Sequence, residues 1–106
     1  MPTSTVETTG AAVLNVRVTV DTLSAELSDG RTISVPLAWY PRLVHASLAE
    51  RNHWRLIGSG HGIHWPDLDE DVSLENLLMG RPSGESQESF KHWLEQRRQQ
   101  APQSGR

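Results

Sequence analysis

The chain has 106 residues, which is enough for one compact domain, since domains usually occupy about 100–150 residues. Ten basic and thirteen acidic residues leave a net charge of −3, so no global positive field favours nucleic acid or an anionic membrane. The lack of cysteine excludes disulfides, thiol catalysis and thiolate metal sites, and no apolar run approaches the roughly 18 residues of a membrane span. The sequence therefore predicts a soluble protein, with the cytoplasm as its expected compartment.

The N-terminal half begins with a small, polar segment and continues with alternating residues. Residues 1–12 contain little to bury and are predicted to form a disordered tail. The alternation that follows is typical of strands with one buried face. It runs through Leu14, Val16, Val18 and Val20, then Leu23, Ala25 and Leu27, then Ile33 and Val35. With a tight turn at Asp29-Gly30, this pattern predicts three short antiparallel strands that end at Pro36.

The central segment changes to a helical period. Apolar residues three and four apart predict one helix from about Pro41 to Arg51, with proline in its first turn. The predicted apolar stripe consists of Leu43, Val44, Ala46 and Leu48. A short strand is expected around Leu56, and a second one at residues 62–65 before Pro66 ends it.

The C-terminal part predicts two further helices. Asp71 or Ser73 caps a short helix that Gly80 closes. After a linker from Arg81 to Glu85, an amphipathic helix spans residues 86–100 and either docks on the domain or binds a partner. Its apolar face carries Phe90, Trp93, Leu94 and Arg97.

The predicted fold class is α+β. A small antiparallel sheet, made of the three N-terminal strands plus one or two after the first helix, packs with that helix, and the short and C-terminal helices follow. The predicted organisation is a tail at residues 1–12, a domain at 13–82, and a linker with the last helix at 83–106.

The whole charge deficit lies in residues 61–80, which hold five acids and no base. Here His61, His64 and Asp67 are the candidate ligands for a divalent metal, although neighbouring side chains on an extended strand diverge. The alternative is structural. Asp67, Asp69, Glu70 and Asp71 would cap the following helix, while His64 and Trp65 close the edge of the sheet.

A second polar cluster surrounds Arg42. Arg42 and His45 share a helix face and could form a basic pair or anion clamp. The favoured interpretation pairs Arg42 and Arg51 with carboxylates of residues 67–71. The sequence contains no nucleophile elbow and no phosphate-binding glycine loop, so neither catalytic residues nor a cofactor are predicted.

Four strings in the chain resemble the bacterial family named domain of unknown function 2442 (DUF2442). They are residues 35–43 (VPLAWYPRL), residues 50–54 (ERNHW), residues 62–71 (GIHWPDLDED) and residues 77–80 (LLMG), so the resemblance covers about 14–82. The polar and aromatic motif residues are Trp39, Tyr40, Pro41, Arg42, Arg51, Trp54, His64, Trp65, Asp69, Glu70 and Asp71. The resemblance implies a compact α+β domain with no established enzyme activity.

The same resemblance implies a partner. Family members often stand beside a protein of domain of unknown function 4160 (DUF4160) in a unit similar to a toxin–antitoxin pair. Some members also carry a helix-turn-helix after the domain. The 22 residues from Glu85 to Arg106 leave room for one helix, so direct operator binding is not expected.

The leading hypothesis is a non-enzymatic, antitoxin-like module that binds a small protein, because tryptophan is enriched at interface hot spots. Two of the four tryptophans are expected in the core, and the contact candidates are Phe90, Trp93, Leu94 and Arg97. One alternative is a metal- or acid/base-dependent enzyme that uses His61, His64 and Asp67 or Asp69. Another is an autoregulator that touches DNA with its partner, through Arg97, Arg98 and Arg106. Homodimerisation through the edge of the first hairpin is a further alternative.

Overall fold

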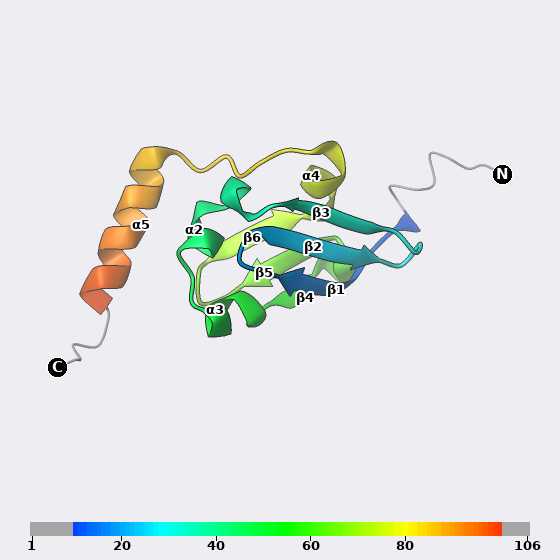
Figure 1. The fold of residues 1–106 in the computed structure, drawn as a ribbon, viewed down its shortest axis with the longest axis horizontal. Helices are drawn as coiled ribbons and strands as arrows, with labels where there is room; N and C mark the ends of the chain where they lie inside the picture. Colours follow the sequence, from blue (N-terminus) through cyan, green and yellow to red (C-terminus); the bar gives the residue numbers. More distant parts are fainter. Residues whose placement is uncertain (1–9, 101–106) are drawn as a thin grey trace.

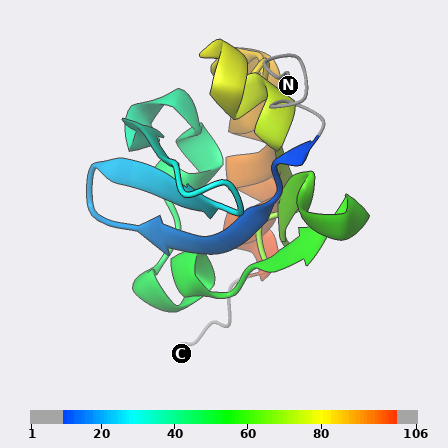
Figure 2. The same cartoon turned by 90° about the vertical axis from the view of Figure 1, so that its right-hand side faces the viewer.

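A computed structural model of the protein describes residues 10–100. Its strands form two antiparallel sheets. The first contains β1 (Val13–Val18), β2 (Thr22–Leu27) and β3 (Thr32–Pro36), and the second contains β4 (Arg55–Ile57), β5 (Gly62–Trp65) and β6 (Glu70–Ser73). The first sheet lies in front of the second in Figure 1, and the two stand side by side after the turn of Figure 2. The sheets therefore make two layers, and their inner faces share one hydrophobic core.

The first strand begins with a register irregularity. The pairing of β1 with β2 shifts between Val13 and Asn15, as at a β-bulge. Because one extra residue reverses the alternation, Val13 is buried while Leu14 is 62% exposed. Val20 follows the strand and is also exposed. The prediction of a buried face from Leu14 to Val20 is therefore right for Val16 and Val18 and wrong at both ends.

The segment between the sheets is not one helix. A 3-10 turn, η1 (Leu37–Trp39), precedes α2 (Pro41–Val44), and α3 (Leu48–Asn52) follows after a break. The break occurs because Ser47 and Glu50 form a capping box, in which each side chain accepts a hydrogen bond from the other residue's backbone N–H. In the predicted apolar stripe, Leu43 is consequently buried and Ala46 partly buried against the core, whereas Val44 and Leu48 are exposed.

The acidic segment belongs to the second sheet. After the 3-10 turn η2 (Gly58–Gly60), β5 pairs with β6, which places Glu70 opposite Trp65 and Asp71 opposite His64. The sequence predicted one or two strands after the first helix, whereas the structure has three. The carboxylates of residues 67–71 do not cap the next helix, α4 (Leu74–Met79). Ser73 caps it by accepting the N–H of Asn76, and Gly80 ends it in the left-handed conformation, both as expected.

The C-terminal helix, α5 (Gln87–Gln100), lies at the end of the molecule beside α2 and α3. Residues 80–86 run along the molecule from α4 to reach it (Figure 1). The Ser83 N–H donates to the Trp39 carbonyl, which fixes this linker to η1. The predicted α+β class, with a C-terminal helix, is confirmed.

The core contains residues from both sheets, from the segments between them and from α5. Trp65 and Trp93 are buried, whereas Trp39 and Trp54 are partly buried against the same cluster. The predicted tail is described only from residue 10, and there Ala11 is already buried and the Ala12 N–H donates to Ser28 Oγ. Residues 1–9 and Arg106 lie outside the described residues. Within the described chain no helix is long and apolar enough to cross a membrane.

Candidate functional site

Arg42 occupies the centre of a polar cluster at the end of the molecule where α5 lies. Tyr40 precedes α2 and Pro41 takes its first position, so Arg42 stands in the first turn of that helix. Its Nη1 donates to the carbonyls of Leu68 and Asp69, at 3.0 and 3.1 Å. Its Nε and Nη2 donate to the Glu85 carboxylate, with the shortest distance 2.6 Å. One guanidinium therefore joins α2, the turn before β6 and the linker.

Glu85 is the carboxylate partner that the sequence did not predict for Arg42. The hydrogen bonds from Arg42 hold the pKa of the Glu85 carboxyl below its usual range, so this group is ionised near neutral pH. Ser89 Oγ, in the first turn of α5, also donates to Glu85 at 2.9 Å. Glu85 therefore connects the domain to the beginning of α5.

Glu70 is the second carboxylate beside Arg42. The residue is only 9% exposed, and its Oε1 lies 3.9 Å from Arg42 Nε, which is too far for a hydrogen bond. Burial raises the pKa of Glu70 to about 7, against the attraction of Arg42, and the nearby charges of Glu85, Asp71 and Asp69 raise it further. Glu70 thus changes its charge near neutral pH, where ordinary glutamates are fully ionised.

The Tyr40 hydroxyl is buried next to this cluster. It has no hydrogen-bond partner within residues 10–100. Burial raises the pKa of the Tyr40 phenol, and the charge of Glu70 raises it further. A buried hydroxyl without a hydrogen bond lowers the free energy of unfolding by about 1–3 kcal/mol. The hydrogen bonding of buried side chains is therefore less complete at this end of the core.

The contact face of α5 consists of the four residues predicted for it. Trp93 is 8% exposed and stacks on Phe90, with ring centroids 5.7 Å apart. The guanidinium carbons of Arg42 and Arg97 lie 5.2 and 4.7 Å from the Trp93 ring centroid, within the range of cation–π contact. Leu94 is partly buried against the core. The helix is therefore docked on its own domain, as the first of the two alternatives predicts.

Two further contacts fix the ends of this face. The Phe90 ring meets the His45 ring edge-on, with centroids 5.1 Å apart. Arg97 Nη2 lies 3.0 Å from Glu50 Oε1. This hydrogen bond and the one between Glu50 and Ser47 lower the pKa of the Glu50 carboxyl, although partial burial raises it. Glu50 therefore both caps α3 and receives Arg97.

Arg51 does not pair with residues 67–71, contrary to prediction. Its Nε and Nη2 donate to the carbonyls of Leu43 and Val44, at 2.9 Å each, and so satisfy the free carbonyls at the end of α2. Arg42 reaches that segment chiefly through backbone carbonyls, with Glu70 as a weaker partner. The indole N–H of Trp65 donates to the Arg51 carbonyl, which makes this motif residue part of the core.

The histidines near the acidic segment are engaged separately. His53 Nδ1 lies 2.7 Å from Asp67 Oδ2, His64 pairs with Asp71, and His61 Nδ1 lies 2.8 Å from the Gly58 carbonyl. Among residues 10–100, no three histidine, aspartate or glutamate side chains converge as a metal site would require. The candidate ligands His61, His64 and Asp67 are therefore not brought together.

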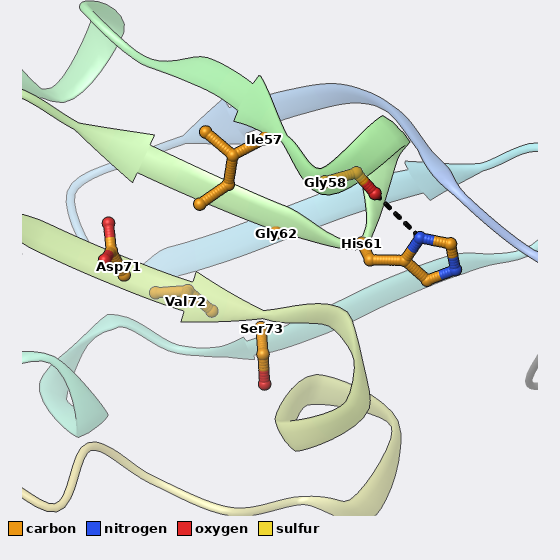
Figure 3. A pocket seen from close by; sticks show the side chains of 7 residues that line it. All are labelled: Ile57, Gly58, His61, Gly62, Asp71, Val72 and Ser73. Carbon is orange, nitrogen blue, oxygen red and sulfur yellow. Dashed lines mark hydrogen bonds between the residues drawn. The ribbon is translucent and has the colours of Figure 1, made fainter.

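A shallow hollow of about 250 Å³ lies on the outer face of the second sheet (Figure 3). Gly62 forms its floor, with Ile57 on the β4 side and Asp71 and Ser73 on the β6 side. A Cβ at Gly62 would approach Ile57 Cγ1 to 2.9 Å, so the hollow depends on glycine there. His61 turns its ring away toward Gly58. Asp71 is thus the single carboxylate that lines the hollow.

Comparisons with known proteins identify a family and a fold. Residues 13–83 match the model described as a protein of unknown function, DUF2442. A protein of unknown function from Rhodospirillum rubrum is 26% identical, with 71% of this chain and 93% of that one covered and a TM-score of 0.62. An uncharacterized protein from Chromobacterium violaceum, solved by NMR, is 21% identical, with coverages of 83% and 82% and a TM-score of 0.63. No curated protein matches the chain.

Proposed function

The chain belongs to the DUF2442 family, and from this premise we propose that it is a non-enzymatic, antitoxin-like module that binds a small protein partner through α5. The observation that supports this proposal is the position of the aromatic face of α5, which Phe90 and Trp93 form. This face lies outside the family match, which ends at residue 83, and it is covered by the chain's own domain. A helix whose aromatic face packs on its own domain can also place that face in a groove on a partner protein.

The contacts that hold α5 support this exchange. They comprise one aromatic stack, the cation–π contacts at Trp93 and the pairs that Glu85 and Glu50 make with arginines. Both ion pairs are largely buried, so a partner that displaces α5 must supply new partners for the arginines, because a buried charge left unpaired is costly. A partner that supplies an apolar groove and a carboxylate for Arg97 would replace the same interactions.

The non-enzymatic part of the proposal is supported by the arrangement of reactive groups. His53 and His64 are each committed to one aspartate, and His61 to a backbone carbonyl. General acid–base catalysis needs groups that converge on one reacting atom. The paired arrangement stabilises the sheet and its turns instead.

The partner proposed is a DUF4160-type small toxin, as the family resemblance implies. Isothermal titration of the purified full chain with such a protein is expected to give a dissociation constant of about 1 μM or tighter. Trp93→Ala should weaken binding at least tenfold, because tryptophan dominates interface energies. Lys91→Ala, on the exposed side of the same helix, is the matched control and should bind as the wild type does.

Two results would contradict the proposal. Lack of heat at 100-fold excess over the expected constant, about 100 μM, would remove this partner class. Equal affinity of Trp93→Ala and wild type would place the binding surface elsewhere. Sedimentation of the chain alone, run in parallel, tests the alternative of a homodimer through the hairpin edge, which would give twice the monomer mass of 11.8 kDa.

A further inference from the structure

Arg42 stands between two carboxylates that come from different parts of the fold. Glu85 belongs to the linker before α5 and holds the guanidinium at 2.6 Å. Glu70 belongs to β6 and lies 3.9 Å from the same guanidinium, without a hydrogen bond. Glu85 therefore binds Arg42 more closely than Glu70 does, and of the two carboxylates only Glu85 is connected to α5.

We propose that the ionisation of Glu70 controls the docking of α5. When Glu70 is protonated, Arg42 is free to bind Glu85, and the linker and α5 stay closed. When Glu70 is ionised, it competes for Arg42 and repels Glu85, and the helix is released. As regulation of partner binding this inference depends on the proposed function, but as an equilibrium within the chain it does not.

The geometry explains how a change at Glu70 reaches the helix. Glu85 receives Arg42 on one side and Ser89 Oγ, from the first turn of α5, on the other. Arg42 also lies over the Trp93 ring. A movement of the guanidinium toward Glu70 would therefore weaken both the linker attachment and the contact with the buried tryptophan.

The sign of the pH effect follows from the pKa of Glu70, which burial raises to about 7. Undocking removes the Glu85 charge, which raises this pKa, and leaves Arg42 to pair with Glu70, so the pKa of Glu70 falls toward the ordinary value near 4.3. The docked state therefore binds more protons between these values, and rising pH favours the undocked state up to about pH 7. A decrease of one unit on release corresponds to a tenfold change in the docking equilibrium.

The other charged groups around Glu70 do not produce this effect by themselves. Asp69 and Asp71 lie on its own segment, Arg42 faces it from α2, Glu85 from the linker and the Tyr40 phenol from the start of α2. At the far end of α5, the hydrogen bonds from Arg97 and Ser47 lower the pKa of Glu50 despite its partial burial, so its pair with Arg97 stays charged near neutral pH. His45 contacts Phe90 on α5, so it is substituted as a control.

The test is millisecond hydrogen exchange of the full chain, read over residues 87–100 by mass spectrometry between pH 5.5 and 8.5. Each rate is divided by the intrinsic chemical rate at that pH, which leaves the opening equilibrium of α5. We expect this equilibrium to increase about tenfold across the range in the wild type. In Glu70→Gln, which cannot ionise, it should stay within about twofold of its value at pH 5.5.

Three variants separate the possible outcomes. Glu26→Gln, at a half-exposed acid of β2, and His45→Asn should both retain the wild-type pH dependence. A tenfold increase that persists in Glu70→Gln, or that disappears in His45→Asn, would overturn the proposal, as would a wild type without any increase. Glu85→Gln should open α5 at every pH, and its retained circular dichroism would show that the rest of the chain is folded. A pH-dependent α5 that binds no partner would contradict the proposed function alone.

Discussion

The guanidinium of Arg42 makes hydrogen bonds that no other cation could reproduce in the same place. It donates to two backbone carbonyls and to one carboxylate, and its flat face lies against Trp93. A lysine has one ammonium group, so it can neither form this fork nor stack on the ring. The chemistry of this residue, and not only its charge, therefore holds α2, the turn before β6 and the linker together.

Arg42→Lys should consequently lower the free energy of unfolding by about 2 kcal/mol, since hydrogen bonds to charged groups contribute about 1.5–3 kcal/mol. Urea denaturation at pH 6 measures the change. Arg17→Lys is the matched control, because Arg17 is exposed and meets Glu26 only at 3.7 Å. A loss at Arg42 no larger than at Arg17 would contradict the organising role of the fork.

At the scale of the element, the β-bulge in β1 decides which residues reach the core. It places Val13 inside and Leu14 outside, although both are apolar and adjacent. Nearby, Gly60 approaches this part of the strand so closely that a Cβ would lie 2.8 Å from Ala12 Cβ. The beginning of β1 is therefore fixed by contact with η2 as well as by its pairing with β2.

The bulge predicts unequal effects of two neighbouring substitutions. Val13→Ala should lower the free energy of unfolding by about 2 kcal/mol, because it removes buried methyl groups and leaves a cavity. Leu14→Ala should change it by less than about 0.5 kcal/mol, because that side chain is 62% exposed. Thermal and urea unfolding of both variants check the difference. Equal losses, or a larger loss at Leu14, would show a strand without the bulge.

At the scale of the whole molecule, α5 is an addition to a domain that the family model already covers. Both sheets and the helices from α2 to α4 lie within residues 13–83. The linker then brings α5 back to the opposite end, where Trp93 completes the core. Domain and helix therefore share a core, but they are joined by few contacts.

Removal of residues 85–106 should leave a folded chain that unfolds in one cooperative transition. Its free energy of unfolding should be lower by about 3 kcal/mol, the usual cost of losing a buried tryptophan. Trp93→Ala in the full chain is the companion variant and should account for most of that loss. Denaturation followed by circular dichroism measures both. Loss of cooperative unfolding in the shortened chain would mean that α5 is an integral part of the domain.

Features that depend on residues close together in the chain could be predicted from the sequence. Local geometry explains the alternation from Val16 to Val35, the turn at Gly30, the strand at residues 62–65 and the caps at Ser73 and Gly80. The break at Ser47 also had a local signal, because a serine three residues before a glutamate is typical of a capping box. The sequence also predicted the four residues of the α5 face.

Contacts between distant groups could not be predicted, because they depend on how the whole chain folds. Arg42 and Glu85 are 43 positions apart, and no spacing rule connects them. The raised pKa of Glu70 depends on its burial in the folded chain and on the nearby charge of Glu85 in the linker, and the exposure of Leu14 depends on a bulge fixed by strand pairing. Likewise, the helical spacing around Trp93 predicts an apolar face on this helix but not the surface against which that face packs. Local propensities act between chain neighbours, whereas burial and charge pairing arise only when the sheets and α5 have closed on one another.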